Sequence, residues 1–304
     1  MLAKWRYHLS LLAVCWIWGL AFIAVKIALE EASFVSVNLI RFILATLALL
    51  PILLIYRKRR PRLSNVDRAR VLFAGICAVY GYHLSVNYGE TLIPAGTAGL
   101  LANTTPIFAA VLARFFLGEK LGAWRAGGII FALGGVAVVT IYGAGETVGT
   151  GRLQGVVFVI LAAFSWAVYT VVLRPLTKAH GVIFVTAYSI IVGAVLQLPL
   201  LAGGGFRRDL QVLSAASWSW LVFLGVGSTV VGYFLYNTGV RGLGATVAAY
   251  YTYLIAPISL FWGWIILGET INLAILAGAA MIIAGLLAVS RDGGAVQAAA
   301  EPGG

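Results

Sequence analysis

Three polar side chains that could bind a small molecule lie close together in a strongly apolar part of the chain. Tyr80, His83 and Asn87 are three and four residues apart, a spacing that places them on one face of a helix. Polar groups inside apolar segments are costly without a partner, so each is a candidate binding residue. His83 could hydrogen-bond a substrate or act as a proton-sensitive switch. The alternative is a structural bond to a neighbouring helix.

Aromatic residues in several apolar segments form a second set of candidates. Tyrosine offers a flat apolar face and a hydroxyl group, which suits a neutral or aromatic substrate. Aromatic residues also form belts at membrane interfaces, and those at the ends of apolar segments fit that alternative. Trp166, Tyr233 and Tyr250 are expected to lie deeper and are assigned to the lining of a binding cavity. Trp18, Tyr169 and the nearby Asn237 are further candidate binding residues.

Arg41 and Asn103 complete the candidate binding residues. Arg41 has no acidic residue within one helical turn, so it could bond the carbonyl ends of neighbouring helices or attract a substrate carboxylate. We expect Lys26 to pair with Glu30. No Asp or Glu is expected deep within an apolar segment, since Glu90 lies near an edge. A proton-linked role would therefore fall to His83 or be absent.

Pro106 and Pro257 interrupt two apolar segments at matching places. A proline removes a backbone hydrogen bond and clashes with the preceding helical turn, which leaves a kink or a hinge. Paired interruptions of this kind are typical of the binding site or gate of inverted-repeat carriers. A static bend without a role is the alternative.

The composition identifies the elements that must position these residues. The chain has 304 residues, of which 62% are hydrophobic and 10% charged, against about 25% charged residues in a soluble domain. A bilayer-spanning helix needs about 20 mostly apolar residues. We predict an all-α polytopic membrane protein with ten transmembrane helices, at residues 7–28, 33–56, 71–91, 95–117, 123–143, 153–174, 181–202, 217–240, 245–267 and 271–290.

The distribution of Lys and Arg among the loops predicts the orientation of the chain in the membrane. With a cytoplasmic N-terminus, only Arg152, Arg207 and Arg208 lie in outer loops, and the other loop and terminal cations lie inside. The C-terminus is then cytoplasmic too. Because the cations follow membrane topology, the net charge of +11 does not indicate a nucleic-acid partner.

The two halves of the chain resemble each other. Trp18 and Trp166 are 148 residues apart, Gly81-Tyr82 matches Gly232-Tyr233, and Leu117-Gly118-Glu119 matches Leu267-Gly268-Glu269. A repeat of five helices, an odd number, must enter the membrane from the opposite side in its second copy. We therefore predict inverted five-helix repeats at residues 1–148 and 149–291, followed by a disordered tail at 292–304. Inverted repeats are the architecture of alternating-access carriers.

The order of these motifs resembles the drug/metabolite transporter superfamily, in its EamA-type branch. The resemblance rests on Trp18-Gly19, Arg41-Phe42 and the segments from Pro106 to Glu119 and from Pro257 to Glu269. It implies a bacterial inner-membrane carrier, usually an exporter of metabolites such as amino acids, and some relatives export aromatic amino acids. It also implies a cavity between helices 1, 3, 4, 6, 8 and 9, with helices 5 and 10 at the periphery.

We therefore expect a secondary transporter of small organic metabolites, in particular amino acids, that is an exporter or a facilitator. We expect a monomer in the lipid bilayer, without a cofactor, a metal site or catalytic residues. A nucleotide-sugar or phosphoester exchanger of similar layout is an alternative, although it would need several cations in its cavity. A membrane enzyme is another, although no nucleophile with a base and no cluster of carboxylates is visible.

Overall fold

The computed structural model of the protein describes residues 2–55, 62–116, 122–142, 149–243, 248 and 251–299, and the regular structure in this part of the chain is helical. Eight helical segments are long and apolar enough to cross a membrane, and two shorter apolar helices, Ile255–Leu267 and Leu273–Val289, accompany them. The predicted all-α membrane fold with ten spans is confirmed.

The first half of the chain supplies five spans. Spans 1, 2 and 5 are single helices, whereas spans 3 and 4 are divided. The elements are α1 (Leu2–Leu29), α2 (Phe34–Ile55), α3 (Asn65–Ile76), η2 (Cys77–Leu84) and α4 (Ser85–Glu90) in span 3, α5 (Ala95–Ala102) and α6 (Thr105–Phe116) in span 4, and α7 (Ala123–Tyr142).

The second half repeats this pattern, with a divided span 8. Its elements are α8 (Thr150–His180), α9 (Val182–Leu196) with η3 (Leu198–Gly203), α10 (Gly205–Val212), α11 (Ala215–Val222), η4 (Phe223–Val231) and α12 (Gly232–Leu243), α14 (Ile255–Leu267) and α15 (Leu273–Ala299). The short helix α10 was not predicted. Helix α15 ends at Ala299, and residues 300–304 lie outside the described part. The disordered tail at 292–304 stays a prediction.

Spans 3 and 8, which correspond in the two halves, both contain a π-helical segment, η2 and η4. A π-helix has a wider turn than an α-helix and is frequent at functional sites. In this fold the two segments therefore change the direction of the side chains on them. Neither π-helical segment was predicted from the sequence.

Spans 4 and 9 are interrupted at equivalent positions. Helix α5 ends at Ala102 and α6 begins at Thr105, while α14 begins at Ile255 after a turn at Tyr253. Pro106 and Pro257 follow these breaks and lie in the first turn of the next helix, where a proline is well tolerated. The predicted interruptions are thus present, and the break precedes each proline.

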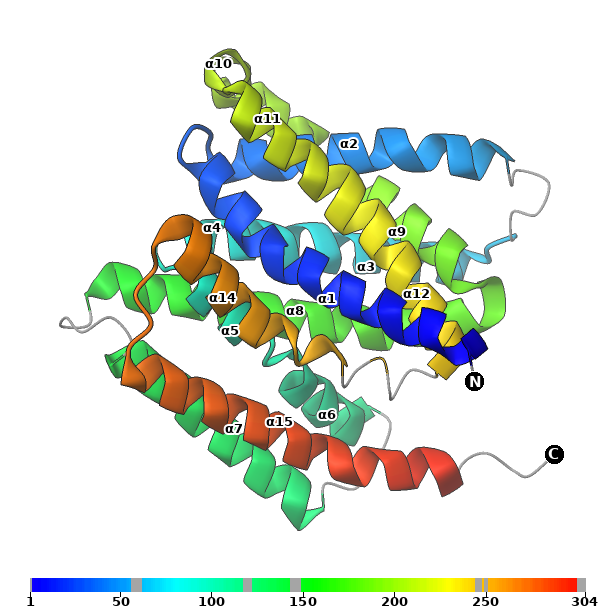
Figure 1. The fold of residues 1–304 in the computed structure, drawn as a ribbon. Helices are drawn as coiled ribbons and strands as arrows, with labels where there is room; N and C mark the ends of the chain where they lie inside the picture. The colour runs from blue at the N-terminus through cyan, green and yellow to red at the C-terminus, as the bar shows by residue number, and fades with distance from the viewer. Residues whose placement is uncertain are drawn as a thin grey trace.

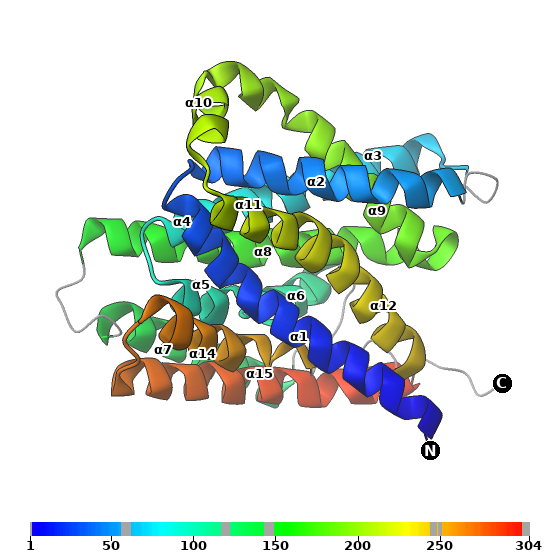
Figure 2. The same cartoon turned by 45° about the horizontal axis from the view of Figure 1, so that its top comes forward.

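The two halves interlock. Helix α1 packs against α12 and α14, α2 packs against η4, and α5 packs against α14. Figures 1 and 2 show α1 crossing the bundle between elements of the second half. We call the end of the bundle with the turn between α1 and α2 the distal end, and the end at which α1 begins the proximal end. Any relative movement of the halves must part contacts at one of these ends.

Helices α7 and α15 lie side by side at the edge of the bundle (Figure 1). A Cβ atom added to Gly128 would lie 2.6 Å from the carbonyl oxygen of Gly285, and one added to Gly135 would lie 2.7 Å from that of Gly278. Glycine at these four positions lets the two backbones touch. Spans 5 and 10 are therefore a peripheral pair.

Candidate functional site

Aromatic side chains from both halves meet in the middle of the bundle. Trp166 of α8 stacks on Tyr169 with ring centroids 4.7 Å apart, and it lies 4.8 Å from Tyr82 of η2. Trp18 of α1 lies 5.3 Å from Tyr236 of α12. Tyr233 joins the two groups, since its ring contacts both Trp166 and Trp18. We call the following set the central aromatic cluster: Trp18, Tyr82, His83, Trp166, Tyr169, Tyr233 and Tyr236.

His83 lies inside this cluster. Its ring packs edge-on against Phe42, Tyr82 and Trp166, with centroids 5.1, 4.8 and 6.2 Å away, and only 7% of the residue is exposed. The two halves contribute to its surroundings, because Phe42 comes from α2 and Trp166 from α8. His83 thus contacts aromatic faces on several sides in this conformation.

Arg41 is the buried cation nearest the cluster. It is 6% exposed, and its guanidinium donates to the hydroxyls of Thr229, at 3.1 Å, and Ser228, at 3.3 Å. These hydroxyls lie on η4, where the carbonyl of Ser228 also accepts a bond from the indole of Trp18. Arg41 therefore bonds hydroxyls here instead of helix carbonyl ends. Within the described residues it forms no ion pair with an acid.

The remaining predicted residues do not all join the cluster. Tyr80 donates to the carbonyl of Leu196 on span 7, away from His83. The π-helical turn of η2 explains this separation, because the three- and four-residue spacing aligns side chains only on an α-helix. Asn103 donates to the carbonyl of Gly99 in its own helix. Asn237 is half-buried on α12, and Tyr250 lies outside the described residues.

Four residues of the site were not among the candidate binding residues predicted from the sequence: Tyr82, Tyr236, Ser228 and Thr229. The match of Gly81-Tyr82 with Gly232-Tyr233 was the signal for Tyr82, since Tyr233 was already a candidate. Ser228 and Thr229 gave no signal, because hydroxyl residues are common in membrane helices and can bond their own backbone.

The expectations for Lys26 and Glu90 were wrong. The ammonium group of Lys26 donates to the carbonyl oxygens of Glu90 and Ile93, and not to Glu30. Glu90 is 0% exposed, although it lies at the end of span 3. Helix α4 packs against α1, α2, α5 and α8, so the end of span 3 lies inside the bundle.

Carboxylates join the two halves at the distal end. The carboxylate of Glu269 accepts bonds from the backbone amides of Ala95 and Gly96, at 2.6 and 2.9 Å, and so caps α5. Glu31 accepts from the amide and hydroxyl of Ser214 at the start of α11. These bonds connect the turn after α14 to span 4, and the turn after α1 to span 8.

Asp209 of α10 completes this arrangement, since it accepts from the amide and hydroxyl of Ser33 at the start of α2. The bonds from Ser214 hold the pKa of Glu31 below its usual range. Burial alone would raise the pKa of Asp209, but the hydrogen bonds from the serines at 36 and 33 outweigh it and the pKa is lowered. We call the pairs Glu31–Ser214 and Asp209–Ser33 the distal clasp.

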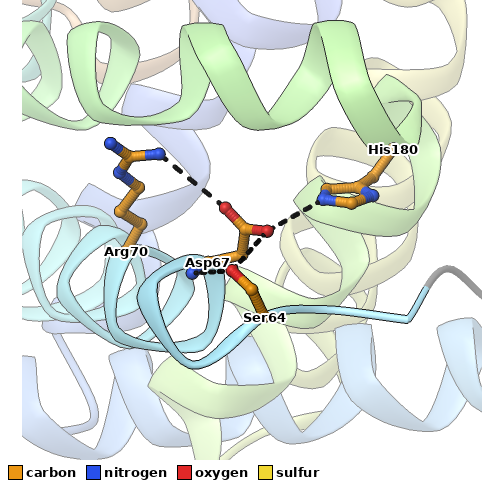
Figure 3. Close-up of polar contacts among 4 residues, drawn as sticks. All are labelled: Ser64, Asp67, Arg70 and His180. Atoms are coloured by element: carbon orange, nitrogen blue, oxygen red, sulfur yellow. Dashed lines mark hydrogen bonds and ion pairs between the residues drawn. The ribbon is translucent and has the colours of Figure 1, made fainter.

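A separate polar contact joins the halves at the proximal end (Figure 3). Asp67 of α3 lies 3.2 Å from the imidazole of His180 at the end of α8, and 3.7 Å from the guanidinium of Arg70. Ser64 caps α3 by accepting from the amide of Asp67. In this conformation α3 and α8 are therefore held together at their proximal ends.

Two surface hollows lie away from the central aromatic cluster. One, of about 420 Å³, lies between α3 and α8 and includes Arg70 and Pro175. The other lies between α7 and α15, around Gly128 and Gly285. Their linings are almost wholly apolar, whereas the central aromatic cluster combines rings with hydroxyl groups and lies beside the buried Arg41. We therefore place the candidate site at the cluster and not at either hollow.

Comparisons with known proteins agree with this picture. The model of the EamA-like transporter family matches residues 5–141 and 153–291. The chain is 30% identical over 277 residues to a "probable terminal-alkyne amino-acid exporter" of Streptantibioticus cattleyicolor, covering 90% of each chain. It is 29% identical over 270 residues to the "uncharacterized transporter YdfC" of Bacillus subtilis, covering 89% of this chain and 86% of that one.

A solved structure has the same fold. It is titled "Crystal structure of protein" and superposes with a TM-score of 0.64 over 94% of this chain and 97% of its own, at 18% identity. Together with the two stretches matched by the family model, this supports a fold built of two repeated units.

Proposed function

Since the chain belongs to the EamA-like transporter family, we propose that it is a secondary carrier of amino acids, neutral and aromatic ones in particular, that works by alternating access. The observation that carries this proposal is a buried Arg41 without an acidic partner among the described residues, next to the central aromatic cluster. A guanidinium pairs well with a carboxylate, and the rings offer flat apolar surface for a side chain.

The geometry suggests how such a substrate would bind. A guanidinium has five N–H donors, and the bonds to Ser228 and Thr229 use two of its nitrogens. A substrate carboxylate would take the remaining donors or replace the hydroxyls. The side chain of the substrate would then lie among Trp18, Trp166 and Tyr233. The amino-acid exporter among the relatives supports this substrate class.

We further propose a place for the protein in the cell. We place it in a bacterial inner membrane with both termini in the cytoplasm, because this orientation puts most loop cations inside. The distal end is then external. The bonds of Glu269 and of the distal clasp hold that end together, which supports our proposal that this conformation is closed to the outside. The halves at residues 1–148 and 149–291 are the units that would rock against each other, with the breaks before Pro106 and Pro257 as hinges.

Reconstitution into liposomes tests the carrier and its site together. Vesicles loaded with an unlabelled amino acid should take up the same labelled amino acid by counterflow, for at least one neutral or aromatic member of a panel. A hydrogen bond to a charged group contributes about 1.5–3 kcal/mol, so Arg41→Gln should lower the initial rate by about 10- to 100-fold.

Arg207→Gln is the matched control, because Arg207 is exposed on α10. It should transport like the parent protein. Absence of counterflow for the whole panel would contradict the proposed substrate class. Equal rates in the parent protein and in Arg41→Gln would contradict the role of Arg41.

A further inference from the structure

A buried acidic group next to the candidate site has no role in the function proposed so far. Glu90 is fully buried, and neither oxygen of its carboxyl group has a hydrogen-bond partner among the described residues. Asn87 lies one helical turn earlier, is 1% exposed, and has a side-chain oxygen that is also without a partner. Three neighbouring acceptor atoms thus lack a donor, in a fold that buries all three.

The charged and titratable groups around Glu90 come from α1, α2, η2 and the turn after α14, and none of them bonds its carboxyl group. Lys26 of α1 donates to the backbone oxygens of Glu90 and Ile93. Glu269, after α14, is bonded to the start of α5. The others within electrostatic reach are Arg41 of α2, whose bonds go to η4, and Tyr82 of η2.

These surroundings decide what Glu90 can hold. An ionised carboxylate without donors is very costly in a buried site, and such groups become neutral instead. A metal cation would need several oxygen ligands and would be repelled by the Lys26 ammonium group beside it. A proton avoids both difficulties: it removes the negative charge of the buried carboxylate, and it needs no further oxygen ligands.

We propose that Glu90 carries a proton during the transport cycle and exchanges it for the metabolite. This inference rests on the proposed carrier function. In the present conformation the carboxyl group holds its proton. When the contacts around it part and water enters, its O–H bond breaks, the proton passes to water, and the carboxylate left behind is balanced by the ammonium group of Lys26. The Glu90 carboxyl group, and not His83, is then the proton-linked group.

Infrared spectroscopy of the reconstituted protein tests the first part without any substrate. The carbonyl stretch of a protonated carboxyl group should be visible at neutral pH, where exposed carboxyl groups are ionised. It should be lost in Glu90→Gln and retained in Glu30→Gln, whose side chain is exposed at the end of α1. Absence of this band from the parent protein at neutral pH would overturn the inference, whether or not the protein carries amino acids.

Transport under an imposed pH gradient tests the second part, with labelled phenylalanine and the remaining amino acids as probes. In the parent protein and in Glu30→Gln, acid on one side should drive the amino acid toward that side. Glu90→Gln should lose this response at least tenfold while it retains counterflow, which also shows that it folds. Glu90→Asp keeps a carboxyl group and should keep part of the response.

The outcomes separate the two proposals. The proton role would be overturned if the pH gradient does not drive transport in the parent protein, or if it still drives transport in Glu90→Gln. The carrier proposal would stand in either case. Absence of counterflow for every amino acid would remove the carrier proposal and, with it, the exchange role, while the infrared band would still report the state of Glu90.

Discussion

Trp166 makes the most ring contacts within the central aromatic cluster, with Tyr82, His83, Tyr169 and Tyr233. Each aromatic pair contributes about 0.5–1.5 kcal/mol beyond the area that it buries. Trp166→Ala should therefore lower amino-acid counterflow by at least about tenfold, since it removes both binding surface and the support of the neighbouring rings. Trp264→Ala, at a tryptophan that is 58% exposed on α14, should leave counterflow unchanged. Similar losses in both variants would contradict the placement of the site.

At this scale the sequence predicted the aromatic part of the site better than the polar part. Trp18, His83, Trp166, Tyr169 and Tyr233 were candidates because polar and aromatic groups are conspicuous in apolar segments, and the fold brings them together. Whether they bind substrate stays a prediction. Tyr80 was misplaced because the π-helical turn is invisible in the spacing of residues. Glu90 was misjudged because its position along the chain does not show that α4 packs against α1, α2, α5 and α8.

Among the helices, the peripheral pair of α7 and α15 offers a sharp test of packing. Adjacent glycines on α7 face different surroundings: a Cβ atom at Gly128 would collide with the backbone of Gly285, whereas one at Gly127 would meet nothing within 4 Å. Overpacking typically costs about 1–3 kcal/mol, so Gly128→Ala should lower the melting temperature in detergent. Gly127→Ala should keep or slightly raise it, because alanine favours helix by about 1 kcal/mol over glycine. Equal shifts in the two variants would contradict this pairing.

The distal clasp predicts a response to acid. The pKa values of Glu31 and Asp209 are lowered in the folded protein, so the clasp stabilises the fold above their unfolded pKa values. That contribution is lost as the pH falls through the lowered values. We compare amide hydrogen exchange at about pH 7 and about pH 3, a range that spans the pKa values of ordinary carboxyl groups. The protection of the amides around residues 31–36 and 209–217, relative to their intrinsic exchange rates at each pH, should fall in acid. The effect should be modest, since exposed pairs contribute little.

The double variant Glu31→Gln with Asp209→Asn is the comparison for this prediction. It should exchange faster at neutral pH already and gain little more in acid. Glu30→Gln should behave as the parent protein, because Glu30 is exposed beside the clasp and does not join the halves. If amide protection in these segments of the parent protein is the same at neutral and acid pH, the clasp does not hold the distal end.

Helices as units were the most predictable level of the structure. The predicted spans agree with the observed ones because long apolar runs can satisfy their backbone groups in a membrane only as helices. The short α10 and the longer α8 were missed, since Gly205–Val212 is polar and Lys178–His180 extend a helix beyond its apolar part. Interruptions within spans 4 and 9 were predicted from Pro106 and Pro257, and they lie a few residues earlier than the prolines.

In the whole molecule the two halves interlock and contact each other at both ends. A carrier that works by alternating access must part these contacts at one end at a time. Contacts at the distal end involve Glu269, Glu31 and Asp209, and the contact of Asp67 with His180 lies at the proximal end. The sequence predicted two similar halves from matched motifs. It did not predict these contacts, because matched motifs do not show which side chains meet across the two halves.

Counterflow with the distal end reversibly locked tests alternating access most directly. Ser33 and Asp209 touch across the halves, with a hydroxyl-to-carboxylate distance of 2.7 Å, so the variant Ser33→Cys with Asp209→Cys can be joined by a short, reducible, membrane-impermeant cross-linker. The native Cys15 and Cys77 are buried, and each single-cysteine variant is a control. The carrier account predicts that cross-linking stops amino-acid counterflow in liposomes, that a reductant restores it, and that the single variants are unaffected. Undiminished counterflow in the fully cross-linked protein would contradict the account.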